Sequence, residues 1–309
     1  MNLKGMEYMG FISELFGYVL NALYNLINNY GIAIIIFSIL LRLILIPITI
    51  KQQKTMKKSN KLQQEMKEIQ AKYKNNPEKL NQETIELYKR EKLSPFSGCL
   101  SAILQLIIIL SVFWLVSQPL TYMKGVQDSD IYKEYKTKLE ENSATKSTYK
   151  EISIINLVES DYQEIVNKLE NENVENREEL ENRKVQLEEL RINMEFLGLD
   201  LSKVPTQSLN DWKVYVIPVL YVITSFISIR ITTNTQKSQN RGGEKSEELE
   251  GMEQMNKSMS YMMPIMSISI AAIAPLGLAL YWLVSNILMI IERLVINKFM
   301  SFKEGEENV

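Results

Sequence analysis

The sequence of 309 residues contains no histidine and a single cysteine, Cys99. Without histidine, the chain has no His-based catalytic triad, no HExxH metalloprotease site and none of the common zinc sites. One cysteine cannot form a disulfide within the chain, and its place in an apolar run favours a packing role. No GxxxxGK[ST] or GxGxxG stretch is present, so no phosphate-binding loop is indicated. We therefore expect no enzyme, no metal and no cofactor, and we find no direct sequence signal for nucleic-acid binding.

Charge is nearly balanced over the whole chain but very uneven along it. The 35 Lys and Arg residues stand against 37 Asp and Glu residues, a net charge of −2. Several near-continuous apolar runs alternate with long, highly charged segments, and average values hide this division. The two kinds of segment are therefore interpreted separately.

The apolar run from Gly31 to Ile50 reads GIAIIIFSILLRLILIPITI and contains one cation, Arg42. About twenty residues that rise 1.5 Å each cross a hydrocarbon core of roughly 30 Å, so the run predicts a membrane helix. A guanidinium inside such a helix costs roughly 2.5–3.5 kcal/mol on insertion scales. The position of Arg42 therefore requires an explanation.

Two explanations of Arg42 stay open. Its side chain can extend along the helix to the interface near Lys51, or it can lie in a water-filled pocket inside the protein. Roughly 13 Å of helix separates the two residues, whereas an arginine side chain reaches about half that distance, which favours the pocket. No Asp or Glu lies deep in any other apolar run, so we expect no buried ion pair and a positive charge that is open to water.

Charge and apolar runs together predict the topology. The Lys-rich stretch that follows the first span places that end of the helix in the cytoplasm. We predict an all-α integral membrane protein with five transmembrane helices that form a core bundle with a hydrophilic groove. The predicted segments are an N-terminal extracytoplasmic amphipathic helix (1–30), transmembrane helix 1 (31–50), a cytoplasmic helical hairpin (51–93), transmembrane helix 2 (94–120), an extracytoplasmic charged helical loop (121–211), transmembrane helix 3 (212–231), a cytoplasmic linker (232–258), a hairpin of transmembrane helices 4 and 5 (259–297) and a cytoplasmic tail (298–309).

The segments outside the spans leave several interpretations open. Residues 1–30 repeat apolar side chains at steps of three and four, which predicts a helix on the bilayer surface, with a cleaved signal peptide as the competing interpretation. In the hairpin, Asn76 and Pro77 supply an N-cap and a first-turn proline, and the hairpin is either a solvated connector or a docking arm. Tyr162 to Met194 is spaced like a long helix or a helical hairpin.

Polar side chains occur on several of the predicted spans. Each is a weak signal alone, because Ser and Thr hydroxyls bond their own helix and Trp commonly anchors a helix end. Together with an arginine, they are predicted to converge on one hydrophilic groove. The predicted groove residues are Arg42, Ser38, Gln105, Trp282, Ser285 and Asn286.

Four stretches of the chain carry a family pattern. They are LLRLILIPITIKQQK around Arg42, SPFSGCLSAILQ at the second span, EFLGLDLSKVP before the third, and MMPIMSISIAAIAPLGLALYWLVSNI over the last two. With these residues, the chain resembles the YidC/Oxa-type membrane protein insertases over nearly all of its length except the outer loop.

The resemblance implies a membrane protein insertase and chaperone that facilitates insertion and folding of membrane proteins without a nucleotide. Arg42 is then the groove arginine that attracts acidic or polar parts of a substrate, and Gln105, Trp282 and Asn286 match the groove lining. The hairpin 51–93 is then a mobile arm that receives substrate. The implied partners are nascent membrane protein substrates, the lipid bilayer, the Sec translocon and ribosome-bound nascent chains. The implied location is the bacterial cell (plasma) membrane, with the N-terminus outside and the C-terminus in the cytoplasm.

The chain departs from the family pattern at a few positions. Ser101 and Ile107 replace prolines that are often found in the second-span motif, and Leu276 replaces the usual small residue before Gly277. A glutamine expected near the end of the fifth span is Glu292. The short acidic tail FKEGEENV lacks the basic ribosome-binding character of some relatives.

Two other functions remain as alternatives to the insertase. An intramembrane arginine also suits a small-anion transporter, although five spans without an inverted repeat disfavour it. A membrane-anchored scaffold would instead use the helical outer loop to hold a partner.

Overall fold

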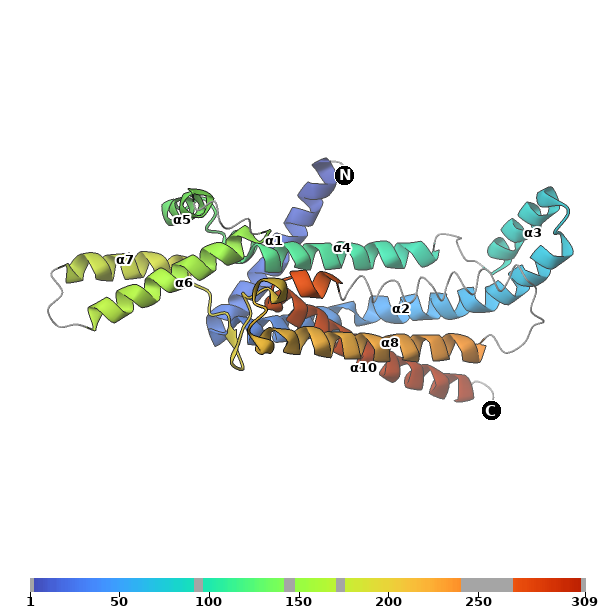
Figure 1. Ribbon diagram of the computed structural model, residues 1–309. Helices are drawn as coiled ribbons and strands as arrows, with labels where there is room; N and C mark the ends of the chain where they lie inside the picture. The colour runs from blue at the N-terminus through green and yellow to red at the C-terminus, as the bar shows by residue number, and fades with distance from the viewer. Residues whose placement is uncertain (1–2, 92–96, 142–147, 171–175, 240–268, 307–309) are drawn as a thin grey trace. The chain divides into compact units, whose positions relative to one another are not determined.

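The computed structural model describes residues 3–91, 97–141, 148–170, 176–239 and 269–306, and most of these are helical (Figure 1). They divide into two compact units. The first comprises Met1–Ile39, Ile108–Tyr221 and Ile268–Val284, and the second comprises Leu40–Ile107, Val222–Ser267 and Ser285–Val309. The all-α class predicted from the sequence is confirmed.

The helices are followed by their labels in Figure 1. The α-helices are α1 (Leu3–Ile27), α2 (Tyr30–Lys72), α3 (Pro77–Arg90), α4 (Ser97–Ser117), α5 (Asp130–Glu141), α6 (Lys150–Leu169), α7 (Arg177–Leu190), α8 (Val216–Gln239) and α10 (Leu276–Glu306). The shorter elements are a π-helix η1 (Leu120–Lys124), the 3₁₀ helices η2 (Pro205–Gln207) and η3 (Trp212–Tyr215), and the strands β1 (Glu195–Phe196) and β2 (Leu199–Asp200). Residues 269–273 are also helical.

Three of the described helical segments are long and apolar enough to cross a membrane. They are Tyr30–Thr55, Trp212–Ile231 and Leu276–Ile296, and a shorter apolar helix covers Ile103–Ser117. Most of the predicted fourth span, Met259 to Ala274, and most of the predicted linker 232–258 lie outside the described residues, which resume at residue 269. The count of five spans therefore stays a prediction.

In the first unit, α1 approaches η1 so closely that only glycine fits between them. A Cβ atom on Gly17 would lie 1.7 Å from the carbonyl oxygen of Tyr122. One turn earlier, Ser13 Oγ donates a hydrogen bond of 3.0 Å to the carbonyl of Ser111. This side of α1 is buried, and the helix leaves other large apolar side chains exposed, namely Phe11, Leu15, Tyr18 and Leu26.

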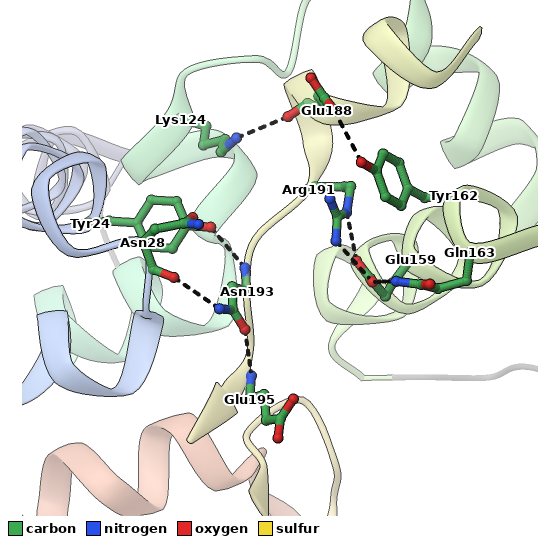
Figure 2. Close-up of polar contacts among 10 residues, drawn as sticks. All are labelled: Tyr24, Asn28, Lys124, Glu159, Tyr162, Gln163, Glu188, Arg191, Asn193 and Glu195. Atoms are coloured by element: carbon green, nitrogen blue, oxygen red, sulfur yellow. Dashed lines mark hydrogen bonds and ion pairs between the residues drawn. The ribbon is translucent and has the colours of Figure 1, made fainter. Parts of the chain in front are cut away.

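The helices α5, α6 and α7 pack together in the first unit around an apolar core of their own. The buried side chains of this core are Ile131, Tyr135, Leu139, Ile155, Val158, Leu187 and Leu190. At its edge, Arg191 donates from Nε and Nη2 to the two oxygens of Glu159, at 2.8 and 3.0 Å (Figure 2). The guanidinium also lies 3.5 Å from the ring centroid of Tyr162. A two-bond ion pair stacked on an aromatic ring thus fastens α7 to α6.

A buried carboxylate fixes the start of η1. Glu151 of α6 accepts hydrogen bonds from the backbone N–H groups of Leu120 and Thr121, at 2.7 and 3.0 Å, and from the hydroxyl of Tyr132 at 3.3 Å. These N–H groups are at the N-terminus of η1 and have no partner within it, so the carboxylate acts as a cap supplied from another helix. Burial nevertheless raises the pKa of Glu151 above its ordinary value, although these hydrogen bonds act against the rise.

Asn193 joins the end of α7 to the end of α1, as Figure 2 shows. Its backbone N–H donates to the hydroxyl of Tyr24 at 2.8 Å, and its Nδ2 donates to the carbonyl of Asn28 at 2.9 Å. Its carbonyl accepts from the backbone N–H of Tyr30 at 3.1 Å. The first residue of α2 is therefore held by the segment that follows α7.

The segment after the strands also sets the start of α10. Strands β1 and β2 pair antiparallel, and the turn between them contains Gly198 at a φ of 74°, a conformation that suits glycine. Farther on, the carbonyls of Leu201 and Lys203 accept from the backbone N–H groups of Gly277 and Leu276, both at 2.9 Å. The first turn of α10, whose N–H groups lack helical partners, is thereby satisfied.

In the second unit, α2 continues past its apolar part, through Pro47, to Lys72, and then reverses into α3. Asn76 caps α3 by accepting from the backbone N–H of Lys79 at 3.1 Å, and Pro77 occupies the first turn, as expected from the sequence. Leu62 of α2 and Leu87 of α3 are buried in this hairpin.

We expect Gly17→Ala to destabilise the first unit, because the new Cβ would meet backbone atoms that cannot move aside. We expect the free energy of unfolding to fall by at least the usual cost of overpacking, roughly 1–3 kcal/mol. Thermal unfolding in a single detergent measures it. Gly10→Ala is the matched control on the same helix, because its Cβ would meet nothing within 4 Å. Equal stability of the two variants would contradict the close approach of α1 and η1.

We also expect acid to loosen the α5–α7 cluster. Burial raises the pKa of Glu159, but the hydrogen bonds and charge of Arg191 outweigh it, so this pKa lies below its ordinary value. The pKa of Asp161 also lies below its ordinary value. Burial raises this pKa, but hydrogen bonds from Lys138 and Tyr135 more than reverse the rise. The stability that these carboxylates contribute is present above their ordinary pKa values, about 4, and is lost as pH falls through the lower folded-state values.

Amide exchange in α6 and α7, corrected for its intrinsic pH dependence, measures this loss. Glu159→Gln should remove part of the pH dependence of amide exchange in α6 and α7 below about pH 4. Glu164→Gln, which breaks only an exposed contact with Lys168, is the control and should leave it unchanged. The assignment fails if the two variants follow the same acid profile.

Candidate functional site

Arg42 of α2 makes two contacts with α10 inside the second unit. Its Nη1 donates to Oε2 of Glu292 at 3.2 Å, and its Nη2 donates to the carbonyl oxygen of Ser285 at 3.3 Å. Only 17% of the Arg42 side chain and 9% of the Glu292 side chain are exposed. Both residues lie within helical segments that are apolar enough to span a membrane. The site is thus an ion pair placed in largely apolar surroundings.

The spacing on α10 explains how one guanidinium reaches both acceptors. Ser285 and Glu292 are two turns apart and share a face of the helix. Helix carbonyls point toward the C-terminus, whereas side chains lean toward the N-terminus, so the carbonyl of Ser285 and the carboxylate of Glu292 converge. Arg42 lies between them.

The expectation that Arg42 has no acidic partner is therefore wrong. Glu292 is near the C-terminal end of the last apolar segment, Leu276–Ile296. Packing of α2 and α10 brings it to Arg42, from a position 250 residues away in the chain. The physical reason is that a buried guanidinium is costly alone, and removing one partner of a buried pair typically costs about 3–5 kcal/mol.

Glu292 holds Arg42 through a single bond. Charge-assisted bonds usually measure about 2.7–2.9 Å, and the Arg42–Glu292 distance is longer, at 3.2 Å. The other oxygen, Oε1, is buried and has no hydrogen-bond donor among the described residues. Arg293, the next residue, is a second cation whose charge interacts with both members of the pair. The carboxylate is therefore not saturated by its surroundings.

Asn286 lies beside Ser285 on α10 and connects this helix to α8. Its Nδ2 donates to Thr224 Oγ1 at 3.2 Å and to Ser225 Oγ at 3.1 Å. Both hydroxyls belong to a segment apolar enough to span a membrane, and Asn286 itself is buried. Interhelical amide–hydroxyl bonds of this kind hold membrane helices together.

The other predicted groove residues have different surroundings. Ser38, in the first unit, is buried and donates to the carbonyl of Ile34 on its own helix, at 2.7 Å. Trp282, also in the first unit, packs against Tyr221 with ring centroids 6.1 Å apart. Gln105, in the second unit, is exposed on α4.

Among the described contacts, Arg42 forms a hydrogen bond with only one of the other five predicted groove residues, Ser285. That bond is to the backbone carbonyl of Ser285. A single groove lined by all six residues stays a prediction. Sequence reasoning missed Glu292 as a site residue, although it was noted as a departure from the family pattern. The available signal was its position two turns after Ser285, on the same helix face.

The arrangement suits binding rather than bond chemistry. Among the described residues, no group of three or more His, Cys, Asp or Glu side chains lies together as a metal site would require. The guanidinium of Arg42 has five N–H donors, and two of its nitrogens each donate one bond within the protein. The remaining N–H groups can bind carboxylate, carbonyl or hydroxyl oxygens.

The sequence matches a known family model over most of its length. The model described as the 60Kd inner membrane protein covers residues 22–304. The chain belongs to this family. Membership agrees with the three segments that are apolar enough to cross a membrane, and it identifies the chain as an all-α integral membrane protein.

Several curated proteins similar to this chain are named membrane protein insertase YidC. One from Fusobacterium nucleatum is 41% identical over 102 residues, which is 33% of this chain and 50% of the relative. One from Caldanaerobacter subterraneus is 40% identical over 105 residues, 34% of this chain and 51% of the relative. One from Francisella tularensis subsp. novicida is 36% identical over 115 residues, 37% of this chain and 21% of the relative. The matched region thus spans about half the length of the first two relatives and a fifth of the third.

A double-mutant cycle tests the ion pair. We expect Arg42→Met and Glu292→Met each to lower the free energy of unfolding, by up to about 3–5 kcal/mol, because each leaves the other charge unpaired. The double variant should lose clearly less than the sum, since it leaves no unpaired charge. Reversible unfolding in mixed micelles measures all three.

The exposed pair Lys168–Glu164 provides the control cycle, with side chains 54% and 64% exposed. Its coupling energy should not exceed about 0.5 kcal/mol. Additive losses at Arg42 and Glu292 would show that the two side chains do not interact.

Proposed function

We propose that the chain is a membrane protein insertase and chaperone that assists insertion and folding of other membrane proteins. The observation that carries the proposal is the pair of Arg42 and Glu292, which places polar binding groups inside segments apolar enough to span a membrane. Charged side chains at such depth face a protein interior or a water-filled cavity and usually mark function. Family membership and the names of the curated relatives support the same reading.

The physical task of such a protein is to lower the free-energy barrier to moving a polar substrate segment across the membrane. A substrate helix gains free energy when about twenty apolar residues enter lipid, but its polar flanking segment must first cross the hydrocarbon core. N–H groups of Arg42, together with Gln105 and Ser285, would offer that segment hydrogen bonds part of the way across. Burial of the substrate helix in lipid then drives release, so no nucleotide and no covalent step is required.

The hairpin of α2 and α3 would receive substrates on the cytoplasmic side. Its charged surface and its direct continuity with the helix that carries Arg42 support this role. The proposed orientation has the N-terminus outside and the C-terminus in the cytoplasm of a bacterial plasma membrane, with α5–α7 on the outer face. The Sec translocon and ribosome-bound nascent chains are proposed as further partners.

The first measurement is insertion of a short single-span substrate with an acidic N-tail, in cells that depend on this protein. Arg42→Lys should keep most activity, because a cation remains beside Glu292. Arg42→Ala should reduce insertion roughly tenfold, the equivalent of one lost polar contact, and Arg42→Glu should be the most harmful because it faces Glu292 with a like charge. All variants are compared at equal expression.

Normal insertion by all three Arg42 variants would contradict the proposed role of Arg42. A membrane-anchored scaffold predicts the opposite pattern, in which removal of residues 125–191 abolishes function and Arg42→Ala does not. The packed α5–α7 cluster makes that alternative worth including in the same experiment.

A further inference from the structure

Two of the arginine–glutamate pairs among the described residues differ strongly in construction. Arg191 binds Glu159 through two bonds of 2.8 and 3.0 Å, stacks on Tyr162, and leaves both carboxylate oxygens bonded. Arg42 binds Glu292 through one bond of 3.2 Å, and the second carboxylate oxygen has no donor among the described residues. The first pair has the geometry of a structural fastener, whereas the second is held by fewer and longer contacts.

A carboxylate that enters the site from a substrate would need the same N–H groups that Glu292 uses. The two acids cannot both lie close to Arg42 without strong repulsion, because like charges a few ångströms apart in apolar surroundings are unfavourable. Glu292 is tethered to the site by its own helix and so competes at high effective concentration. An entering acid must therefore displace it.

We propose that Glu292 is a specificity-determining residue that acts as a displaceable internal counter-ion of Arg42. This inference rests on the proposed insertase function. While Glu292 is in place, it neutralises the charge of Arg42. Neutral polar segments then bind without penalty, whereas an acidic segment must displace a resident carboxylate. Acidic segments consequently bind more weakly than Arg42 alone would allow, and basic segments are repelled less.

The role of Glu292 predicts that removing the negative charge at position 292 shifts substrate preference toward acidic segments and away from basic ones. Glu292→Gln keeps the size of the side chain and removes its charge. It should raise affinity for an acidic segment roughly tenfold, leave a neutral segment nearly unchanged and weaken a basic segment. The double variant Arg42→Glu with Glu292→Arg exchanges the two charges and so restores an ion pair. It should keep the protein folded and should keep the wild-type preference among acidic, neutral and basic segments.

The experiment uses the full chain in nanodiscs and three synthetic single-span peptides with the same apolar segment. Their N-tails carry Asp residues, Ser residues or Lys residues, and binding is measured by fluorescence titration. Glu292→Gln is repeated in an Arg42→Ala background, where its gain for the Asp tail should disappear because no cation remains to be released. Asp130→Asn, which removes an exposed negative charge in the first unit, is the matched control and should shift no preference.

A merely structural role for Glu292 would give a different result. In that case Glu292→Gln would weaken all three peptides together, in parallel with a lower unfolding temperature, and the proposal would be overturned. A gain for the Asp tail that persists without Arg42 would overturn it equally. Insertion of the same peptides into liposomes is scored separately. Wild-type protein that binds with these preferences but inserts nothing would refute the insertase function and leave the role of Glu292 intact.

Discussion

A single charge in an apolar helix constrains the second unit. Arg42 cannot be left without partners at low cost, so α10 supplies a carboxylate and a backbone carbonyl two turns apart. This requirement fixes the rotation of α10 toward α2. The same rotation turns Asn286, the neighbour of Ser285, to the hydroxyls of α8. Three helical segments that are otherwise almost uniformly apolar thus gain a defined register from a few polar contacts.

Three carboxylates of the chain are bound in different ways. Glu151 accepts several hydrogen bonds and caps the N-terminus of η1, and Glu159 is matched by a two-bond arginine. Glu292 has one bonded and one unbonded oxygen among the described residues. The first two arrangements join neighbouring elements and are nearly saturated. The third keeps an unused acceptor in the part of the protein where polar groups are most expensive, which is the mark of a group retained for more than stability.

Local features of this fold were accessible from the sequence, and partners distant in the chain were not. The cap at Asn76, the helices within residues 121–211 and the long apolar helices follow from residue type and spacing. The partner of Arg42 does not, because Glu292 is 250 residues away and no local pattern connects the two positions. The same limit hid the close contact of Gly17 with the backbone of Tyr122. Periodicity identifies which face of a helix is buried, but tertiary packing decides what that face meets.

Pro47 creates a point inside the continuous helix α2 at which the helix bends more easily. Proline has no backbone N–H, so it cannot bond the carbonyl one turn earlier, and its ring pushes that turn apart. About 25 residues of helix, or roughly 37 Å, lie between this weakened point and the tip of α2. A change of about 10° at Pro47 would move the tip by roughly 6 Å. Arg42 is little more than one turn from Pro47, so α2 is a lever whose long arm carries the charged end of the helix and whose short arm holds the guanidinium.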